Sequence, residues 1–208
     1  MNASNLNFIA FDLETTGLYP ELDKIIEVGA VKYINGQVDS VFSTLVDPEQ
    51  AIPAMATKIN GITNDMVKGK PLIQNTLEAL TQFCQDFIMV AHNATFDFQF
   101  LQTNFKRCKM QAPNSLVVDT YGMAKKIVPG LPNYKLGTLV QHFNIQSEVF
   151  HRAEDDAKYC AEVFMNLVKK VTGGPSLPPS ENLISLSGKH FYFAQLKEED
   201  KQTSLFDV

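Results

Sequence analysis

Three segments at the start of the chain carry the residue pattern of β-strands. Residues 7–14, 25–34 and 37–46 are rich in β-branched and aromatic side chains, and in the first of them apolar residues occur on both faces. The Asn35-Gly36 pair between the second and third segments predicts a tight hairpin turn, because both residues tolerate a positive φ angle. We therefore expect three leading strands, two of them joined directly.

The rest of the chain predicts helices that alternate with short strands. Helical periodicity covers residues 75–87, 95–107 and 153–171, and the last segment has its apolar residues on one stripe at the 3.6-residue period. Short apolar runs at 88–91 and 116–118 predict two further strands. This order of elements predicts an α/β fold, in which a mixed sheet is flanked by helices.

Proline and glycine mark loops and a linker. Pro48 and Pro53 predict a loop after the third strand, and the segment after the last helix holds five prolines and glycines in nine positions. We therefore expect one domain over residues 1–171, a linker over 172–181 and a C-terminal peptide tail over 182–208.

The composition is that of a soluble globular protein. Of 208 residues, 45% are hydrophobic and 20% are charged, which excludes collagen, a coiled coil and wholesale disorder. No apolar run approaches the roughly 18 residues of a membrane span, and residues 1–5 lack the features of a signal peptide. The three cysteines (Cys84, Cys108, Cys160) are odd in number and lack metal-ligand spacing. We therefore expect no disulfides, no membrane partner and a cytoplasmic location.

The net charge decides little about partners. Eighteen basic and 23 acidic residues give 18 − 23 = −5, which gives no sign of general nucleic-acid binding through counterion release. It does not exclude a nucleic-acid enzyme, because bound metal ions can invert the charge of an acidic cleft.

Asp12 and Glu14 are the first residues with candidate chemistry. They lie two positions apart in a predicted strand, so both carboxylates leave the same face. Carboxylates held close together raise each other's pKa unless a cation lies between them. Their oxygens suit a hard divalent metal such as Mg²⁺ or Mn²⁺. The alternative is a chance pair on the protein surface.

Asp97 and Asp156 add carboxylates near the starts of two predicted helices. For Asp97 the alternative role is an acid that the helix dipole favours. On the helix over 153–171, Asp156 lies at the edge of the apolar stripe and can face a cleft, whereas Asp155 faces water.

His151 precedes Asp156 by five positions. On one helix the two side chains would lie about 140° apart, so they can share a site only if His151 lies in the loop before the helix. The alternative is a solvent-exposed histidine without a role in the site.

Four acids and one histidine can be joined in one mechanism. Two divalent ions roughly 3.5–4 Å apart can clamp a scissile phosphate, and a histidine with a pKa near ~6.5 can deprotonate the attacking water. The chain has no phosphate-binding Gly-Lys-Ser/Thr loop, no His-Glu-x-x-His motif and no Cys-x-x-Cys pair. Metal-assisted phosphodiester hydrolysis therefore fits the residues best.

Three segments resemble the exonuclease motifs of the DEDD superfamily. They are Phe11–Gly17, His92–Asp97 and His151–Ala157. A histidine five positions before the last aspartate is typical of the His-containing branch. Within it the chain is most similar to the proofreading (epsilon) exonucleases of bacterial replicative DNA polymerases and their free-standing relatives. The similarity extends to residues 59–63 and 118–120 and covers about residues 7–171.

The resemblance implies a ribonuclease-H-like fold with a mixed five-stranded sheet. It also implies a 3′-to-5′ exonuclease that uses two divalent metal ions, Mg²⁺ or Mn²⁺, and releases nucleoside monophosphates. By analogy Asp12, Glu14 and Asp156 would bind one metal, and Asp12 together with a water held by Asp97 would bind the other. His151 would be the general base.

The resemblance implies substrate contacts as well. Thr15 would hold the 3′ end, and Leu18 would wedge beside the terminal base. Asn60 stands where some relatives carry a substrate-contacting histidine, so contact there is an open expectation. Two other polar residues could bind metal, but we expect a different role for each: Asp119 caps a helix, and His92 orients its loop.

The tail carries a separate resemblance. The segment from Gln202 to Phe206, with Gln202, Leu205 and Phe206 as its anchors, resembles the peptide by which bacterial replication and repair proteins dock on the sliding clamp. The alternative is a tail that folds back and buries Leu205 and Phe206 on its own domain.

These expectations combine into one function. We expect hydrolysis of single-stranded or frayed DNA 3′ ends in replication proofreading or repair, with a polymerase catalytic subunit as a further candidate partner. An RNA-trimming exoribonuclease is one alternative, because the same motifs serve both nucleic acids. A non-catalytic clamp-binding adaptor on the same fold is the other.

Overall fold

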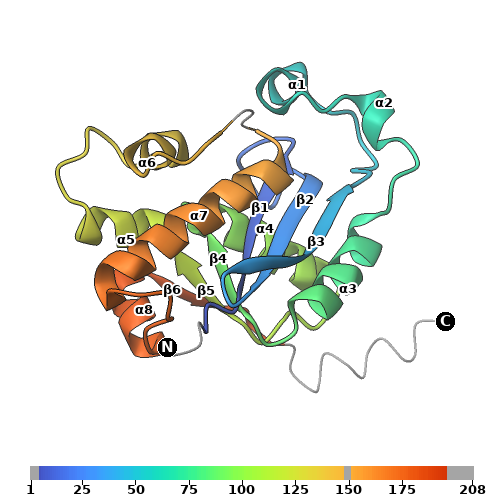
Figure 1. The fold of residues 1–208 in the computed structure, drawn as a ribbon. Helices are drawn as coiled ribbons and strands as arrows, with labels where there is room; N and C mark the ends of the chain where they lie inside the picture. Colours follow the sequence, from blue (N-terminus) through green and yellow to red (C-terminus); the bar gives the residue numbers. More distant parts are fainter. Residues whose placement is uncertain (1–4, 148–150, 196–208) are drawn as a thin grey trace.

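The protein is built around one six-stranded mixed sheet with helices on both faces (Figure 1). The computed structural model describes residues 5–147 and 151–195. The strand order is β3-β2-β1-β4-β5-β6. The strands are β1 (Phe8–Thr15), β2 (Ile25–Ile34), β3 (Gln37–Leu45), β4 (Ile88–Ala91), β5 (Leu116–Asp119) and β6 (His190–Tyr192). The helices are α1 (Ala54–Asn60), α2 (Asn64–Val67), α3 (Ile73–Cys84), α4 (Thr95–Arg107), α5 (Thr120–Ile127), α6 (Leu136–His142), α7 (Ala153–Thr172) and α8 (Ser180–Ser187).

The predicted α/β class is confirmed. Strands β1, β2 and β3 pair in antiparallel fashion, whereas β1, β4 and β5 run parallel to one another. The hairpin turn is also confirmed, with φ angles of 54° at Asn35 and 76° at Gly36. No helix in the part of the chain that the structure describes is both long and apolar enough to cross a membrane.

The expected strand number was wrong by one, because β6 adds a sixth strand. It pairs with β5 in antiparallel fashion, with Val117 opposite Phe191. Phe193, the first residue after β6, is 3% exposed and lies in the core beside Phe98 and Phe105. Burial of this short aromatic patch outweighs the cost of closing the connection that precedes it.

The domain therefore extends past residue 171, where we had placed its end. Helix α8 packs on α5 so closely that a Cβ atom on Gly122 would lie on the backbone of Ser187. The Ser187 hydroxyl also accepts a hydrogen bond from the Asp119 amide at 2.9 Å. Residues 182–193, which we had expected to belong to the tail, and the last two residues of the expected linker, 180–181, are thus part of the folded unit.

The expected loop after β3 contains two short helices, α1 and α2. Their buried residues form a small apolar cluster with β2 that includes Ile26, Ile52 and Ile62. Helix α1 ends at Gly61, whose φ of 73° suits a left-handed C-cap. Helices of four to seven residues carry too few turns for their periodicity to be recognised in the sequence.

Strand β1 separates the two halves of the core. Phe8 and Ala10 face the cluster under α7, whereas Ile9 and Phe11 face the cluster under α3 and α4. The face that carries Phe8 and Ala10 continues with Asp12 and Glu14. The carboxyl ends of the parallel strands β1, β4 and β5 meet at one edge of the sheet. The polar residues that follow these strands therefore come together there.

Candidate active site

A cleft of about 580 Å³ lies at this edge of the sheet. It receives side chains from β1, from the loop after β4 and from α4, α5, α6 and α7. Its lining residues are Asp12, Leu13, Glu14, His92, Asn93, Phe96, Asp97, Tyr121, Lys135, Leu136, His151 and Asp156. The structure thus brings together all five residues that the sequence proposed for catalysis.

Asp12 and Glu14 enter the cleft from the end of β1. Burial raises the pKa of Asp12 well above its ordinary value, and the charges of Asp97 and Asp156 raise it further. Burial likewise raises the pKa of Glu14 to about 7, although a hydrogen bond with Asn60 opposes the shift. Both shifts mean that the protein itself supplies too little positive charge around these carboxylates.

Asp97 lies in the first turn of α4 and is 3% exposed. Its Oδ1 accepts a hydrogen bond from the Leu13 amide at 3.1 Å, which connects α4 to β1 beside Asp12. Burial raises the pKa of Asp97 to about 8 despite this bond. The position at the helix start agrees with the expected dipole effect, yet the side chain faces the other acids.

Asp156 and His151 come from the start of α7. His151 lies before the helix, which begins at Ala153, and its φ of 69° belongs to the left-handed region. Its amide donates to Asp156 Oδ2 at 3.0 Å. The other oxygen, Asp156 Oδ1, is buried and has no hydrogen-bond partner among the residues that the structure describes. The prediction that His151 lies in the loop before the helix is confirmed.

The donor set fits a divalent cation. Single ligand atoms of Glu14, His151 and Asp156 lie within 4.8 Å of one another. Burial raises the pKa of Asp156 as well. A buried oxygen without a partner and several carboxylates with raised pKa values are stabilised when a cation lies among them.

The sequence analysis missed an ion pair that positions this cluster. Glu27 on β2 is 2% exposed and lies opposite Glu14 in the β1–β2 register. Arg152 Nη2 donates to Glu27 Oε1 at 2.6 Å, and the Ala153 amide donates to Glu27 Oε2 at 3.0 Å. Glu27 therefore anchors the start of α7 at Ala153. Ala153 is two positions after His151 and three positions before Asp156. The signal in the sequence was one acid within the apolar run of β2.

Close packing at the same point requires a glycine. A Cβ atom on Gly29 would lie 2.3 Å from the backbone carbon of Ala153. The absence of a side chain therefore lets α7 approach β2. The glycine and the ion pair together determine where the helix begins over the sheet.

None of the three predicted substrate residues lines the cleft, although Asn60 is hydrogen-bonded to Glu14. Asn60 is buried, and its Nδ2 donates to the Thr15 carbonyl at 3.4 Å. Thr15 is itself buried and donates its hydroxyl to the Gly17 carbonyl at 2.6 Å. Leu18 is 73% exposed at the end of β1. Substrate contact by these residues stays a prediction.

Asp119 and His92 have the roles that we expected. Asp119 is the N-cap of α5 and accepts from the Tyr121 amide at 3.0 Å. His92 Nδ1 lies 2.9 Å from the Thr120 hydroxyl, and burial lowers its pKa to about 4. His92 thus connects the loop after β4 to the start of α5.

Two aromatic residues of the cleft, Phe96 and Tyr121, were not singled out from the sequence. Both rings are partly exposed and line the cleft. Aromatic faces in such a place can stack on nucleobases. Their spacing in the sequence gave no signal, because they reach the cleft from different helices.

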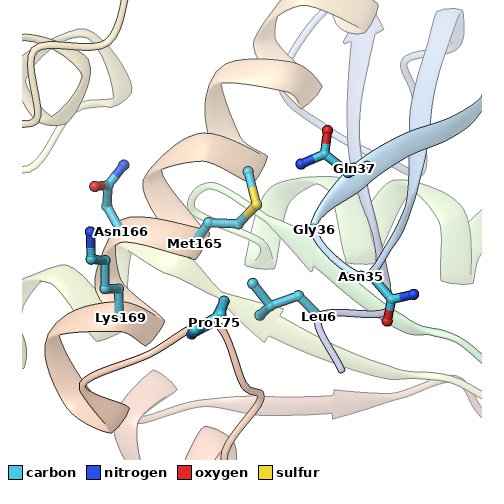
Figure 2. Close-up of a pocket in the computed structure, with 8 residues that line it drawn as sticks. All are labelled: Leu6, Asn35, Gly36, Gln37, Met165, Asn166, Lys169 and Pro175. Atoms are coloured by element: carbon cyan, nitrogen blue, oxygen red, sulfur yellow. The ribbon is translucent and has the colours of Figure 1, made fainter. Parts of the chain in front are cut away.

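Another cavity lies away from the acids. Figure 2 shows eight residues around a space of about 460 Å³ between α7, the β2–β3 turn and the segment after α7. Leu6, Met165 and Pro175 supply its apolar wall. None of the eight lining residues carries a carboxylate. This cavity therefore has no donor set for the predicted chemistry.

The predicted clamp-binding residues Gln202, Leu205 and Phe206 lie outside the described residues. The structure therefore says nothing about the tail peptide.

Comparison with known sequences identifies the family. The exonuclease family profile matches residues 9–164. The chain is 44% identical over 163 residues to the DNA polymerase III subunit epsilon of Treponema pallidum, covering 77% of this chain and 76% of that relative. It is also 40% identical over 164 residues to the PolC-type DNA polymerase III of Caldanaerobacter subterraneus, but spans only 12% of that longer protein.

Solved structures share the fold. The chain resembles exonuclease X in complex with 5′-overhanging duplex DNA, with a TM-score of 0.70 at 24% identity, over 87% of this chain and 99% of that one. It also resembles E. coli exonuclease I in complex with a dA16 oligonucleotide, with a TM-score of 0.67 at 20% identity, over 78% of this chain and 40% of that one. The profile match over most of the chain and the epsilon relative show that the chain belongs to the exonuclease family.

Proposed function

We propose that this exonuclease removes nucleoside monophosphates from DNA 3′ ends in a metal-dependent reaction. The observation that carries the proposal is the convergence of four carboxylates and one histidine in a single cleft. The names of the relatives support DNA as the substrate, since they are a polymerase III subunit, a polymerase and exonucleases solved with DNA.

Two divalent ions, Mg²⁺ or Mn²⁺, complete the proposed site. Asp12, Glu14 and Asp156 would hold one ion, and Asp12 together with a water held by Asp97 would hold the other. When bound, the ions neutralise charge on the phosphate and lower the pKa of a coordinated water. The raised pKa values of these carboxylates support a cation site, because a cation removes the repulsion that raises them.

His151 acts as the general base in this proposal. Its side chain is exposed, and the hydrogen bond from its amide to Asp156 holds its backbone at the rim of the cleft. The imidazole takes a proton from the attacking water, and the bond between phosphorus and the 3′ oxygen of the next nucleotide breaks. That oxygen takes up a proton from solvent, and the imidazolium releases its own proton to solvent. Exposure suits this role, because the proton must leave in each turnover.

The terminal nucleotide lies over the end of β1. Thr15 holds its 3′ hydroxyl, and the exposed Leu18 side chain wedges beside its base. Asn60 is buried between Thr15 and Glu14, so in this proposal it supports the pocket from behind more than it touches the base.

The cellular role that we propose is proofreading or repair in the cytoplasm, with a DNA polymerase catalytic subunit as partner. The epsilon subunit of T. pallidum is the relative that supports it. The tail residues Gln202, Leu205 and Phe206 would dock on a sliding clamp, which keeps the nuclease near a primer end. Deletion of residues 202–208 tests the tail: we expect lost clamp binding in a pull-down with unchanged nuclease activity.

The reaction is tested by digesting matched DNA and RNA single strands, labelled at the 5′ end, with Mg²⁺, Mn²⁺ or EDTA. We expect a metal-dependent ladder that shortens from the 3′ end of the DNA. Faster loss of the RNA would assign the protein to RNA trimming. If folded protein gave no ladder on either strand, the adaptor would replace the enzyme as the best proposal.

A further inference from the structure

A cavity other than the one in Figure 2 lies beside the active-site cleft, and we call it the second cavity. It has a volume of about 440 Å³ and is bounded by α5, the end of α8 and the residue before β6. Asn93 and Tyr121 line both this cavity and the cleft, so the two spaces share a wall. A ligand held in the cleft therefore lies next to the second cavity.

Three lysines give this cavity a positive charge. They are Lys125, Lys126 and Lys189. All three side chains are exposed, and none takes part in a salt bridge among the described residues. The chain as a whole has a net charge of −5, so three ammonium groups around one cavity make this part of the surface positive in an otherwise acidic protein. They suit an anionic ligand.

The contacts of these lysines keep their charges at the cavity. Lys125 Nζ lies 5.5 Å from the centre of the Tyr121 ring, at the boundary with the cleft. Lys189 Nζ donates to the Thr95 hydroxyl at 3.5 Å, and Lys126 Nζ donates to the Ser185 carbonyl. These partners are neutral, so the ammonium charges stay available to a ligand.

One carboxylate, Asp119, also lines the cavity. Its Oδ1 accepts hydrogen bonds from the amides of Ala94 and Tyr121, at 3.2 and 3.0 Å. It thus serves as the cap of α5 and is turned toward the protein backbone. The three lysines outweigh its charge.

The order of the strands gives the ligand a direction. Helix α1, which ends with Asn60, lies near the start of β2 on one side of the acids, whereas α5, α8 and β6, which carry or adjoin the three lysines, lie on the β5–β6 side of the sheet (Figure 1). A strand whose terminal nucleotide lies near Thr15 must cross the carboxylates and then continue away from α1. The lysine-lined cavity lies in that direction.

We propose that this cavity binds the phosphodiester backbone of the DNA strand behind the scissile phosphate, through Lys125, Lys126 and Lys189. The inference rests on the proposed function and adds the path of the substrate. A competing path runs along α6, where a cavity of about 500 Å³ shares the lining residues Lys135, Leu136, His151 and Asp156 with the cleft. That path carries one lysine, Lys135. Three ammonium groups bind successive phosphates more strongly than one.

The test compares two substrates of different length. A single-stranded DNA 20-mer reaches the cavity, whereas the p-nitrophenyl ester of thymidine 5′-monophosphate ends at the scissile phosphate. In the triple variant Lys125→Gln/Lys126→Gln/Lys189→Gln we expect KM for the 20-mer to rise roughly tenfold at low salt. The slope of log(kcat/KM) against log[salt] should flatten by about 2, since each phosphate contact on a single strand contributes about 0.7. Hydrolysis of the mononucleotide ester should be unchanged.

Control variants separate local from general charge. The triple variant Lys106→Gln/Lys169→Gln/Lys170→Gln removes the same charge from the last turns of α4 and α7 and should leave the slope unchanged. Replacement of the three cavity lysines by arginine should keep the wild-type slope. If loss of the Lys126–Ser185 contact prevents folding, the double variant Lys125→Gln/Lys189→Gln should flatten the slope by about 1.4.

The two proposals fail in different ways. If the wild-type protein hydrolyses neither substrate with Mg²⁺ or Mn²⁺, the proposed function is wrong. If the wild-type protein is active and the cavity variants keep its KM and its salt slope, the DNA path is wrong. Lowered activity on the mononucleotide ester would also overturn the inference, because the lysines would then act on the catalytic cluster.

Discussion

Glu14 and Glu27 are neighbouring acids with opposite environments, the first half-buried and the second buried. They lie directly opposite each other on β1 and β2, so their side chains share one face of the sheet. Glu27 accepts three hydrogen bonds from Arg152 and one from the Ala153 amide. Glu14 is raised in pKa to about 7 by burial, with only Asn60 and the more distant Arg152 charge opposing the shift.

The difference shows how one sheet face can be both scaffold and active site. At Glu27 the protein provides its own counter-charge, and the result is a fixed start for α7. Asp12, Glu14, Asp97 and Asp156 form no salt bridge with any of the described residues, so these carboxylates are suited to bind a counter-charge from outside. Buried carboxylates of the first kind stabilise the fold, whereas those of the second kind reduce stability until a cation binds.

The largest expected effect is the loss of activity when one unpaired acid is neutralised. Asp156→Asn should lower kcat/KM by about 1,000-fold, because a lost metal ligand removes several kcal/mol of transition-state stabilisation. The melting temperature in EDTA should stay at or above that of the wild type, since a buried uncompensated charge is removed. Digestion assays and thermal melts measure both. Asp155→Asn on the adjacent, half-exposed acid is the control and should be near wild type. Full activity of Asp156→Asn would refute the site.

Breaking the paired acid should instead affect stability first. Arg152→Met leaves Glu27 buried with the Ala153 amide as its remaining donor. We expect a loss of about 2 kcal/mol in the free energy of unfolding, less than for a fully buried pair because Arg152 is 45% exposed. Urea denaturation measures it. The control Lys158→Met removes an exposed pair with Glu154 and should cost less than about 0.5 kcal/mol.

A double variant sharpens this prediction. Arg152→Met combined with Glu27→Gln removes both charges, and at least half of the lost stability should return. If the single and double variants were equally unstable, the cost would come from packing at the start of α7 and not from the ion pair.

The unpaired acids should make stability depend on pH and on metal. The pKa of Glu14 is about 7 in the folded protein against an ordinary value of 4.5, so the folded state holds an extra proton between these values. Its contribution to stability is therefore present below about pH 4.5 and is lost as the pH rises through 7, and Asp97 extends the loss to about pH 8. At pH 8, Mg²⁺ should raise the melting temperature by roughly 2–4 °C for each kcal/mol that its binding adds to the free energy of unfolding.

Melts from pH 4 to 9 in EDTA and in Mg²⁺ test this dependence. Glu14→Gln removes one of the titrating groups, so its melting temperature should vary less with pH in EDTA than that of the wild type. A wild-type melting temperature that rose between pH 5 and 8 in EDTA would have the wrong sign and would contradict unpaired burial.

The smallest expected effect concerns the one hydrogen bond that opposes the shift at Glu14. Asn60→Ala removes it, so the pKa of Glu14 should rise further. Activity at pH 6 should fall by about two- to threefold because protons then compete better with the metal. At pH 9 the difference from the wild type should disappear. A loss that is independent of pH would instead show that Asn60 acts only through the Thr15 carbonyl.

Local patterns in the sequence were enough for the elements that carry the catalytic residues. Strand β1 and helix α7 were recognised because their apolar residues recur at fixed periods over eight and twenty residues. Asp12, Glu14 and Asp156 stand at defined points of those periods, so their faces followed from the sequence. The position of His151 before the helix followed from the angle between it and Asp156.

Contacts between distant segments decided the rest. Strand β6 has three residues and is held by pairing with β5, more than seventy positions earlier, so no local period marks it. The Glu27–Arg152 ion pair joins residues 125 positions apart, and the three lysines of the second cavity come from α5 and the residue before β6. Side-chain type and period are local properties, so the residues capable of the chemistry could be recognised in the sequence. The pairing of Glu27 and the clustering of the three lysines depend on which segments pack together, so both became visible in the folded structure alone.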